Sequence, residues 1–254
     1  MLDTTALFRL DGRTAIITGG TRGIGRAIAE GFGSAGARLV VASRKPEACQ
    51  RTVAELSAAG IEAIGVPCHM GSLSDVQALV AATVDRFGSI DIVVNNAANA
   101  LTEPVGSFSS DGFDKSVGVN VKGPVFLTQE ALPHLRTSSH ASVINIVSAG
   151  AWLYSAFVAM YAANKAAMVS YTKSMAAALA SDDIRVNALA PGAVDTDMVR
   201  NTGPQGEEMM ARACLMGRIA DASEMVGPAL FLASDASSFL TGTVVHADGG
   251  LVAR

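Results

Sequence analysis

The chain has 254 residues, of which 50% are hydrophobic and 17% charged, and its formal net charge at pH 7 is -4. This length and composition predict one large domain with a substantial core, and they argue against disorder and a coiled coil. The slight acidity gives no basic surface for nucleic acid or anionic lipid, so the expected partner is a small molecule.

The cysteines, the first residues and one uncharged stretch bear on where in the cell the protein is expected. Cys49, Cys68 and Cys214 are an odd number without a Cys-x-x-Cys pair, which predicts neither a disulfide framework nor a zinc site. A reducing cytoplasm fits this usage. The first residues, MLDTTALFRLDGR, carry several charges and predict no secretory signal. Residues 141–164 carry no charge, but their polar residues favour a buried strand and helix over a membrane span.

Short apolar runs alternate with longer segments of helical spacing along the chain. The apolar runs predict strands buried on both faces, at residues 14–18, 38–42, 62–66, 90–95, 142–147, 184–189 and 243–246. The segments between them predict helices, at residues 23–35, 46–59, 74–87, 112–135, 155–180 and 223–233, with Ser74 as one capping residue. This alternation predicts an α/β fold, a doubly wound parallel seven-stranded sheet with helices on both faces. Without a linker or repeat, residues 1–254 are expected to form a single domain.

A glycine-rich segment, TGGTRGIG, joins the first strand to the first helix. Gly19, Gly23 and Gly25 allow the backbone to approach a pyrophosphate, and the helix that follows directs amide groups and its positive dipole end at the charge. Tight packing of strand and helix without a nucleotide is the alternative. The spacing differs from the common Gly-x-Gly-x-x-Gly and resembles the TGxxxGIG motif of short-chain dehydrogenases/reductases.

This resemblance continues in motif order over nearly the whole chain, ending at GTVVHADGG. It implies a Rossmann fold, a nicotinamide cofactor, and similarity to carbonyl reductases and 3-oxoacyl-acyl carrier protein reductases. It also implies that the cofactor contacts in the glycine turn are Gly19, Thr21, Arg22, Gly23, Ile24 and Gly25.

The residues after the second strand bear on the choice of cofactor. NAD-binding folds commonly have an acid there for the ribose 2′-hydroxyl, whereas this sequence has Ser43, Arg44 and Lys45. A carboxylate would repel a 2′-phosphate that an arginine would bind. We therefore predict NADP(H) rather than NAD(H), with Arg22 as a second positive charge near that phosphate. The alternative is that Arg44 and Lys45 belong to a solvated loop.

Two more segments resemble cofactor contacts of the family. In IDIVVNNAANA, Ala98 replaces the glycine of the NNAG motif, and the resemblance implies contacts from Asn96, Ala97 and Ala98. The methyl group of Ala98 is acceptable unless the backbone there needs positive φ. In CHMGS, His69 stands where relatives commonly have an aspartate for the adenine amino group, with Met70 beside it. A plain surface histidine is an equal alternative.

Tyr161 and Lys165 are four residues apart in a predicted helix and share one face. An ammonium beside the phenol lowers the tyrosine pKa from about 10 toward working pH, which acid/base catalysis requires. This spacing alone arises by chance in many helices. Ser148 strengthens it, because it ends a predicted strand at the family's distance from the tyrosine, where open α/β sheets bind ligands. Its hydroxyl can donate to a substrate oxygen as negative charge develops.

The remaining matches concern the proton relay, the nicotinamide and the substrate. Asn120 matches the asparagine that relatives use, with a water and the lysine, in a proton relay; an ordinary polar helix residue is the alternative. Irregular composition at residues 197–218 predicts a mobile lid over the substrate, or else a surface excursion without a gating role. The family's segment for the nicotinamide carboxamide is matched by Pro191, Gly192, Val194 and Thr196.

Together these residues predict an oxidoreductase that moves hydride between NADP(H) and a carbonyl or secondary alcohol. The alternatives are an NAD-dependent alcohol or sugar dehydrogenase of the same family, and a nucleotide-binding sensor without catalysis. A sensor would normally lack the serine, tyrosine or lysine. No His/Cys cluster suggests a metal, and the resemblance implies a homotetramer or homodimer. Trp152, Leu153, Tyr154 and Phe157 form either an apolar substrate wall, core or a subunit contact.

Overall fold

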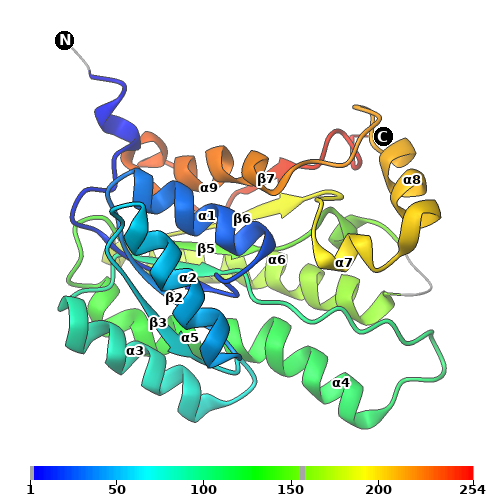
Figure 1. Ribbon diagram of the computed structural model, residues 1–254, viewed down its shortest axis with the longest axis horizontal. Helices are drawn as coiled ribbons and strands as arrows, with labels where there is room; N and C mark the ends of the chain where they lie inside the picture. Colours follow the sequence, from blue (N-terminus) through cyan, green and yellow to red (C-terminus); the bar gives the residue numbers. More distant parts are fainter. Residues whose placement is uncertain (1–2, 155–157, 254) are drawn as a thin grey trace.

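The computed structural model describes residues 3–154 and 158–253. It contains one parallel sheet in the strand order β3-β2-β1-β4-β5-β6-β7, which confirms the predicted doubly wound fold (Figure 1). The direction of strand addition reverses between β1 and β4, and such switch points are where open α/β sheets bind ligands. The strands are β1 (Thr14–Thr18), β2 (Arg38–Ser43), β3 (Ala63–Pro67), β4 (Ile92–Asn95), β5 (Ser142–Ile146), β6 (Arg185–Pro191) and β7 (Val244–Ala247).

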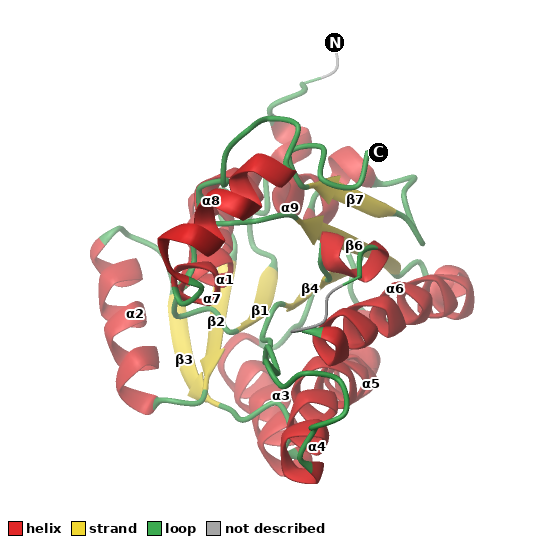
Figure 2. Cartoon of the chain, turned by 90° about the vertical axis from the view of Figure 1, so that its right-hand side faces the viewer, coloured by secondary structure: helices red, strands yellow, loops and turns green. Residues whose placement is uncertain are grey.

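Helices cover both faces of the sheet, as Figure 2 shows. One layer consists of α1 (Gly23–Ser34), α2 (Pro46–Ala58) and α9 (Val226–Ala233). The opposite layer consists of α3 (Leu73–Phe87), α5 (Gly123–Leu135) and α6 (Ala159–Leu179). Three further helices lie nearer the carboxyl ends of the strands, namely α4 (Ser110–Val117), α7 (Asp197–Arg200) and α8 (Gly203–Ala213).

Successive residues of a strand point to opposite faces of the sheet and pack in the hydrophobic cores on those two faces. Ile16 of β1 packs in the layer of α3 and α5, whereas Ile17 packs in the layer of α1 and α9. Both side chains are fully buried. A strand covered on both faces buries residues on both sides, which is why the sequence shows nearly continuous apolar runs rather than alternation.

One predicted helix, at residues 112–135, is interrupted in the structure. It consists of α4, a π-helical turn over Gly118–Lys122, and α5. Pro124, at the start of α5, has no N–H to donate to the carbonyl four residues earlier, that of Asn120, so a regular α-helical ladder cannot continue there. Such π turns often occur at functional sites.

Smaller differences concern helix ends. The cap of α3 is Ser72, whose hydroxyl accepts a hydrogen bond from the Asp75 amide at 3.3 Å, and not the predicted Ser74. The predicted start of the helix at residue 155 and the predicted contact of Phe157 lie outside the described residues. Within the described ranges, the helices lack the combination of length and hydropathy that crossing a bilayer requires.

Candidate active site

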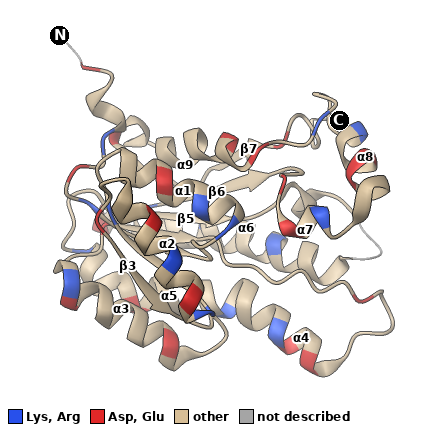
Figure 3. Ribbon diagram, viewed as in Figure 1, with Lys and Arg blue, Asp and Glu red and all other residues tan. Residues whose placement is uncertain are grey.

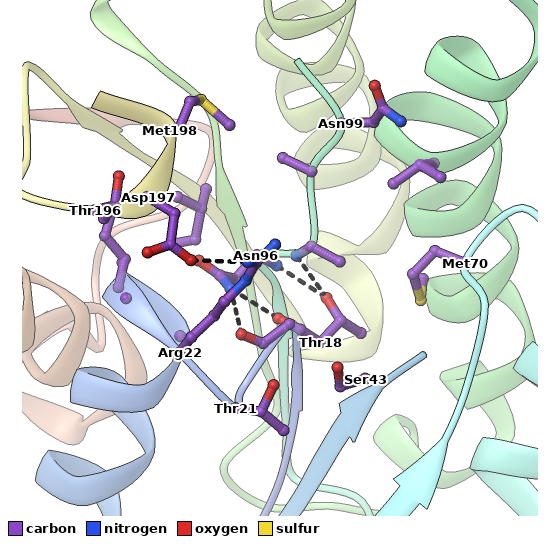
Figure 4. A pocket seen from close by; sticks show the side chains of 18 of the residues that line it. Thr18, Thr21, Arg22, Ser43, Met70, Asn96, Asn99, Thr196, Asp197 and Met198 are labelled. Atoms are coloured by element: carbon purple, nitrogen blue, oxygen red, sulfur yellow. Dashed lines mark hydrogen bonds and ion pairs between the residues drawn. The ribbon is translucent and has the colours of Figure 1, made fainter. Parts of the chain in front are cut away.

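A cavity of about 610 Å³ opens where β1, β2, β4, β5 and β6 end (Figure 4). It is lined by segments that are far apart in sequence, from Thr18 at the end of β1 to Thr196 beyond β6. Of the predicted cofactor contacts, His69 is the one that does not line it. Of the predicted catalytic residues, Ser148, Tyr161 and Lys165 line the cavity and Asn120 does not.

The glycine turn forms the floor of the cavity next to the start of α1. Gly19 and Gly23 have φ values of 65° and 52°, in the left-handed region that favours glycine. A Cβ atom at Gly25 would lie 2.3 Å from Nδ2 of Asn96 and 2.4 Å from the carbonyl oxygen of Gly19. The lack of a side chain at Gly25 therefore lets α1 pack closely on the turn, and the start of α1, which lines the cavity, fits a dinucleotide pyrophosphate.

Thr18 and Asn96 tie the glycine turn to the loop after β4. The Thr18 hydroxyl accepts hydrogen bonds from the amides of Asn96 and Ala97, both at 3.0 Å. The Asn96 side chain donates to the Thr18 carbonyl at 2.8 Å and to the Gly19 carbonyl at 3.3 Å. Thr18 was not predicted, although it ends the first strand. Ala98 adopts no positive φ, so its methyl group is tolerated as predicted.

Basic side chains gather at the end of the cavity beside β2. Arg44 and Lys45 line this end as predicted, and Arg51, from the second turn of α2, lines it as well. Among the described residues, none of the three forms a salt bridge, and the one acid in the cavity lining is Asp197 at the other end. Sequence reasoning missed Arg51, which lies one helical turn after Ala48, another residue of the lining, because only the position of α2 beside the cavity brings this face of the helix to the site.

Arg22 also lines the cavity, and its charge is paired. Its guanidinium forms a salt bridge of 2.8 Å with Asp197, the first residue of α7, as Figure 4 shows. Arg22 precedes α1, and its side chain, 74% exposed, meets the carboxylate of Asp197 across the turn. That Arg22 adds positive charge near a 2′-phosphate stays a prediction.

Ser148, Tyr161 and Lys165 come together at the end of the cavity beside β5. Ser148 follows β5, and its hydroxyl accepts a hydrogen bond from the Gly150 amide at 3.1 Å. It also shares a side-chain hydrogen bond with Tyr161. Nζ of Lys165 lies 5.5 Å from the centre of the Tyr161 ring and donates to the Ile146 carbonyl at 2.6 Å.

Residues 19–252 match a family model described as enoyl-(acyl carrier protein) reductase. The chain is also 41% identical over 249 residues to an Arabidopsis thaliana protein named short-chain dehydrogenase/reductase SDRA, covering 97% of each. It belongs to the short-chain dehydrogenase/reductase family. Members are NAD(P)(H)-dependent oxidoreductases that act on CH–OH groups, so this short-chain dehydrogenase/reductase is an enzyme of alcohols and carbonyls.

Solved structures agree with this assignment. A gluconate 5-dehydrogenase from Burkholderia cenocepacia, in complex with NADP and tartrate, has a TM-score of 0.94 and 33% identity, covering 99% of this chain and 100% of that one. A 7α-hydroxysteroid dehydrogenase complexed with NADH and 7-oxo glycochenodeoxycholic acid has a TM-score of 0.94 and 31% identity, covering 98% of each. The same architecture thus serves either nucleotide and very different substrates.

Burial controls the acid/base properties of the two titratable groups in this enzyme. It raises the pKa of the Tyr161 phenol, against a smaller opposing effect of the hydrogen bond with Ser148. It lowers the pKa of Lys165 to about 8. The sequence predicts a lowered tyrosine pKa, and the structure differs because burial removes the phenol from water, an effect that outweighs the hydrogen bond with Ser148.

Asn120 and His69 make local contacts outside the cavity. The Asn120 side chain accepts from the Asn99 amide at 2.8 Å and donates to the Asn99 carbonyl at 2.7 Å. Nδ1 of His69 accepts from the Gly71 amide at 3.1 Å. Asn99 lines the cavity, so Asn120 touches the site through another residue, whereas His69 stabilises its own turn.

The lining beyond β6 includes the four residues predicted for the nicotinamide. Thr196 donates its hydroxyl hydrogen to the Val194 carbonyl at 3.2 Å. Met198 of α7 also lines the cavity, at the start of the predicted lid. Trp152 contacts the ring of His246, with 4.5 Å between ring centres, and it lies outside the lining, as do Leu153 and Tyr154.

Proposed function

We propose that this enzyme interconverts a carbonyl compound and a secondary alcohol with NADP(H), and that Tyr161 is its acid/base. One observation carries the proposal. Ser148, Tyr161 and Lys165 meet at one end of a cavity whose other end carries Arg44, Lys45 and Arg51 without an acid.

Each residue of the catalytic end has a role in the proposed reduction. When bound, NADPH supplies a hydride to the carbonyl carbon. The Ser148 hydroxyl donates a hydrogen bond to the substrate oxygen as negative charge develops there. Tyr161 gives that oxygen its proton, and in the oxidation it takes the proton back. The raised pKa keeps the phenol protonated at neutral pH, which is the form that a reduction consumes.

Lys165 contributes a buried positive charge to the same end. Its ammonium lies beside the Tyr161 ring and favours the phenolate that forms when the proton leaves. We also propose that it holds the ribose of the cofactor, because its one hydrogen bond to a described residue is to the Ile146 carbonyl and an ammonium has three donors.

The preference for NADP(H) rests on charge at the basic end. A 2′-phosphate carries negative charge and accepts charge-assisted hydrogen bonds, which Arg44, Lys45 and Arg51 can donate. The named NADP complex of the gluconate 5-dehydrogenase supports this choice, and the NADH complex of the steroid dehydrogenase keeps NAD(H) as the alternative.

The domain, its lid and its association with other copies are also proposed. We propose that residues 1–254 form one catalytic domain, with residues 197–218 as a substrate lid. Exposed alanines on α6, including Ala163, Ala166 and Ala167, support close helix packing between copies in a homodimer or homotetramer. Acidic and basic residues are interspersed on the face shown in Figure 3, which supports a small-molecule substrate rather than nucleic acid.

The test is oxidation of NADPH and, in parallel, of NADH with a panel of aliphatic and aromatic ketones, sugars and 3-oxoacyl thioesters. We expect turnover with at least one class and a higher kcat/KM with NADPH. Tyr161→Phe should remove turnover and leave NADPH affinity nearly unchanged. Full activity in that variant would refute the mechanism, and a higher kcat/KM with NADH would refute the cofactor preference. NADPH binding without turnover of any class would favour the nucleotide sensor.

A further inference from the structure

A fully buried hydroxyl on α4, that of Ser116, accepts hydrogen bonds from two asparagine side chains. Nδ2 of Asn164, on α6, lies 2.9 Å from it, and Nδ2 of Asn120, in the π-helical turn, lies 3.2 Å from it. The exposed fractions of the three residues are 0%, 4% and 2%. A hydroxyl oxygen has two lone pairs, so one atom can serve both amides.

The two amides belong to segments that lead to different parts of the cavity lining. Asn164 directly precedes Lys165 and follows Tyr161 by three residues, so it belongs to the turn of α6 that carries both. Asn120 holds the backbone of Asn99 in both directions, at 2.8 and 2.7 Å, and Asn99 lines the cavity. Ser116 therefore links the catalytic turn of α6 to the loop that follows β4.

The catalytic turn lies near the start of its helix, where a fixed position matters most. Tyr161 is the third residue of α6, and helix ends fray unless tertiary contacts hold them. Further along, Thr172 fixes α6 to β5 by accepting a hydrogen bond from Asn145 at 2.8 Å, but two helical turns separate it from Lys165. On the turn itself, Tyr161 shares a hydrogen bond with Ser148 and Lys165 donates to the Ile146 carbonyl, both toward β5. The hydrogen bond of Asn164 to Ser116 ties the same turn to α4.

We propose that Ser116 is a positioning residue for the reaction, acting through Asn164 on the Tyr161–Lys165 turn and through Asn120 on the Asn99 loop. This inference rests on the proposed function of Tyr161. The sequence gives no sign of it, because Ser116 lies 45 residues before Tyr161 and belongs to no motif.

The loss of the Ser116 hydroxyl as an acceptor determines the expected effect on the rate. Removing the hydroxyl leaves two buried amide donors without that acceptor, and each is destabilising unless it finds a new partner. The cheapest relief is a small shift of either asparagine, and a misplacement of about 1 Å far from the chemistry can lower a rate by as much as 100-fold. The loss should therefore fall on kcat.

The experiment compares Ser116→Ala, Asn164→Ala and the double variant with a matched control, Ser142→Ala. Ser142 is equally buried, donates one hydrogen bond to the Leu232 carbonyl at 2.9 Å, and lies at the end of β5 farthest from Ser148. We expect each single variant to lose about tenfold or more in kcat with little change in NADPH affinity. The double variant should lose no more than the worse single variant, and Ser142→Ala should keep its kcat despite a similar loss of stability.

A second readout needs no turnover. The chain has three tyrosines, so the ultraviolet titration of Tyr161 is obtained by subtracting the Tyr161→Phe protein in each background. The groups beside this phenol are the Ser148 hydroxyl, whose hydrogen bond lowers its pKa, and the Lys165 ammonium. If the turn moves away from Ser148, the pKa of Tyr161 should rise further in Ser116→Ala.

An unchanged titration and unchanged kcat in Ser116→Ala would overturn the proposal, and so would additive losses in the double variant. If Ser116→Ala does not fold, Asn164→Ala decides alone, because alanine has the highest helix propensity and α6 already contains many. Absence of turnover in the wild-type protein would contradict the proposed function, whereas the titration would still test the positioning.

Discussion

Replacing Lys165 with methionine should stabilise the protein at neutral pH while removing its activity. Burial lowers the pKa of this lysine from 10.5 to about 8, so the folded protein holds a charge that it disfavours. The difference corresponds to about 3 kcal/mol, because one pKa unit is worth about 1.4 kcal/mol. Methionine keeps a similar length and carries no charge.

The pH dependence of the free energy of unfolding follows from proton binding by Lys165 in the folded and unfolded states. Below pH about 8 the lysine is charged in both states, so the folded state bears the full penalty. Between about 8 and 10.5 the unfolded chain binds a proton that the folded protein has released, and stability therefore rises with pH. Above 10.5 the lysine is neutral in both states and the advantage of methionine disappears.

The assay is urea unfolding of the two proteins from neutral pH to pH about 10.5, with the free energy obtained by linear extrapolation. Methionine also leaves the Ile146 carbonyl without its 2.6 Å partner, a cost that does not depend on pH. The change of the stability difference with pH therefore isolates the proton. Both proteins should carry Tyr161→Phe, so that the neighbouring phenol does not titrate. A stability difference that stays constant across this range would refute the reasoning.

Other predictions concern the two ends of the cavity. Arg44→Gln and Arg51→Gln should each weaken NADPH binding by about tenfold or more and leave NADH binding unchanged, since a hydrogen bond to a charged group is worth about 1.5–3 kcal/mol. The control is Arg212→Gln, because the partner of Arg212, Glu208, lies on the same helix. Equal effects on the binding of both nucleotides would contradict the assignment of the basic end. Gly25→Ala should abolish nucleotide binding or folding because its Cβ would lie 2.3 Å from the Asn96 amide. Gly227→Ala, at a glycine with open space around its Cβ position, should be neutral by calorimetry and by NADPH titration.

Most of the fold was predictable because its signals are local. A strand covered by helices on both faces is mostly apolar, and β1, β4 and β5 are buried at every position. The π-helical turn was not predictable from periodicity, since a period of 3.6 describes α4 and α5 equally well. Its cause, the missing N–H of Pro124, was visible in the sequence but looks like an ordinary helix start.

The candidate site likewise contains residues that sequence spacing predicts and residues that it does not. Ser148, Tyr161 and Lys165 were found because their spacing follows from a strand end and one helix face. Arg22 and Ser116 behave differently, since their partners Asp197 and Asn164 are remote in sequence. Tertiary structure decides such pairs, and a single sequence carries no signal for them.

The order of the strands has a consequence for how the enzyme is made. β1 pairs with β4 across the whole of the β2 and β3 units, and the cavity needs walls from both sides of that seam. A ribosome that has released only the first half of the chain has produced the glycine turn but neither Ser148 nor Tyr161. Nucleotide cradle and proton donor are thus brought together only when the later strand β5 docks on β4. That late docking is a slow, non-local step, during which the unpaired edge of β4 is exposed to other chains.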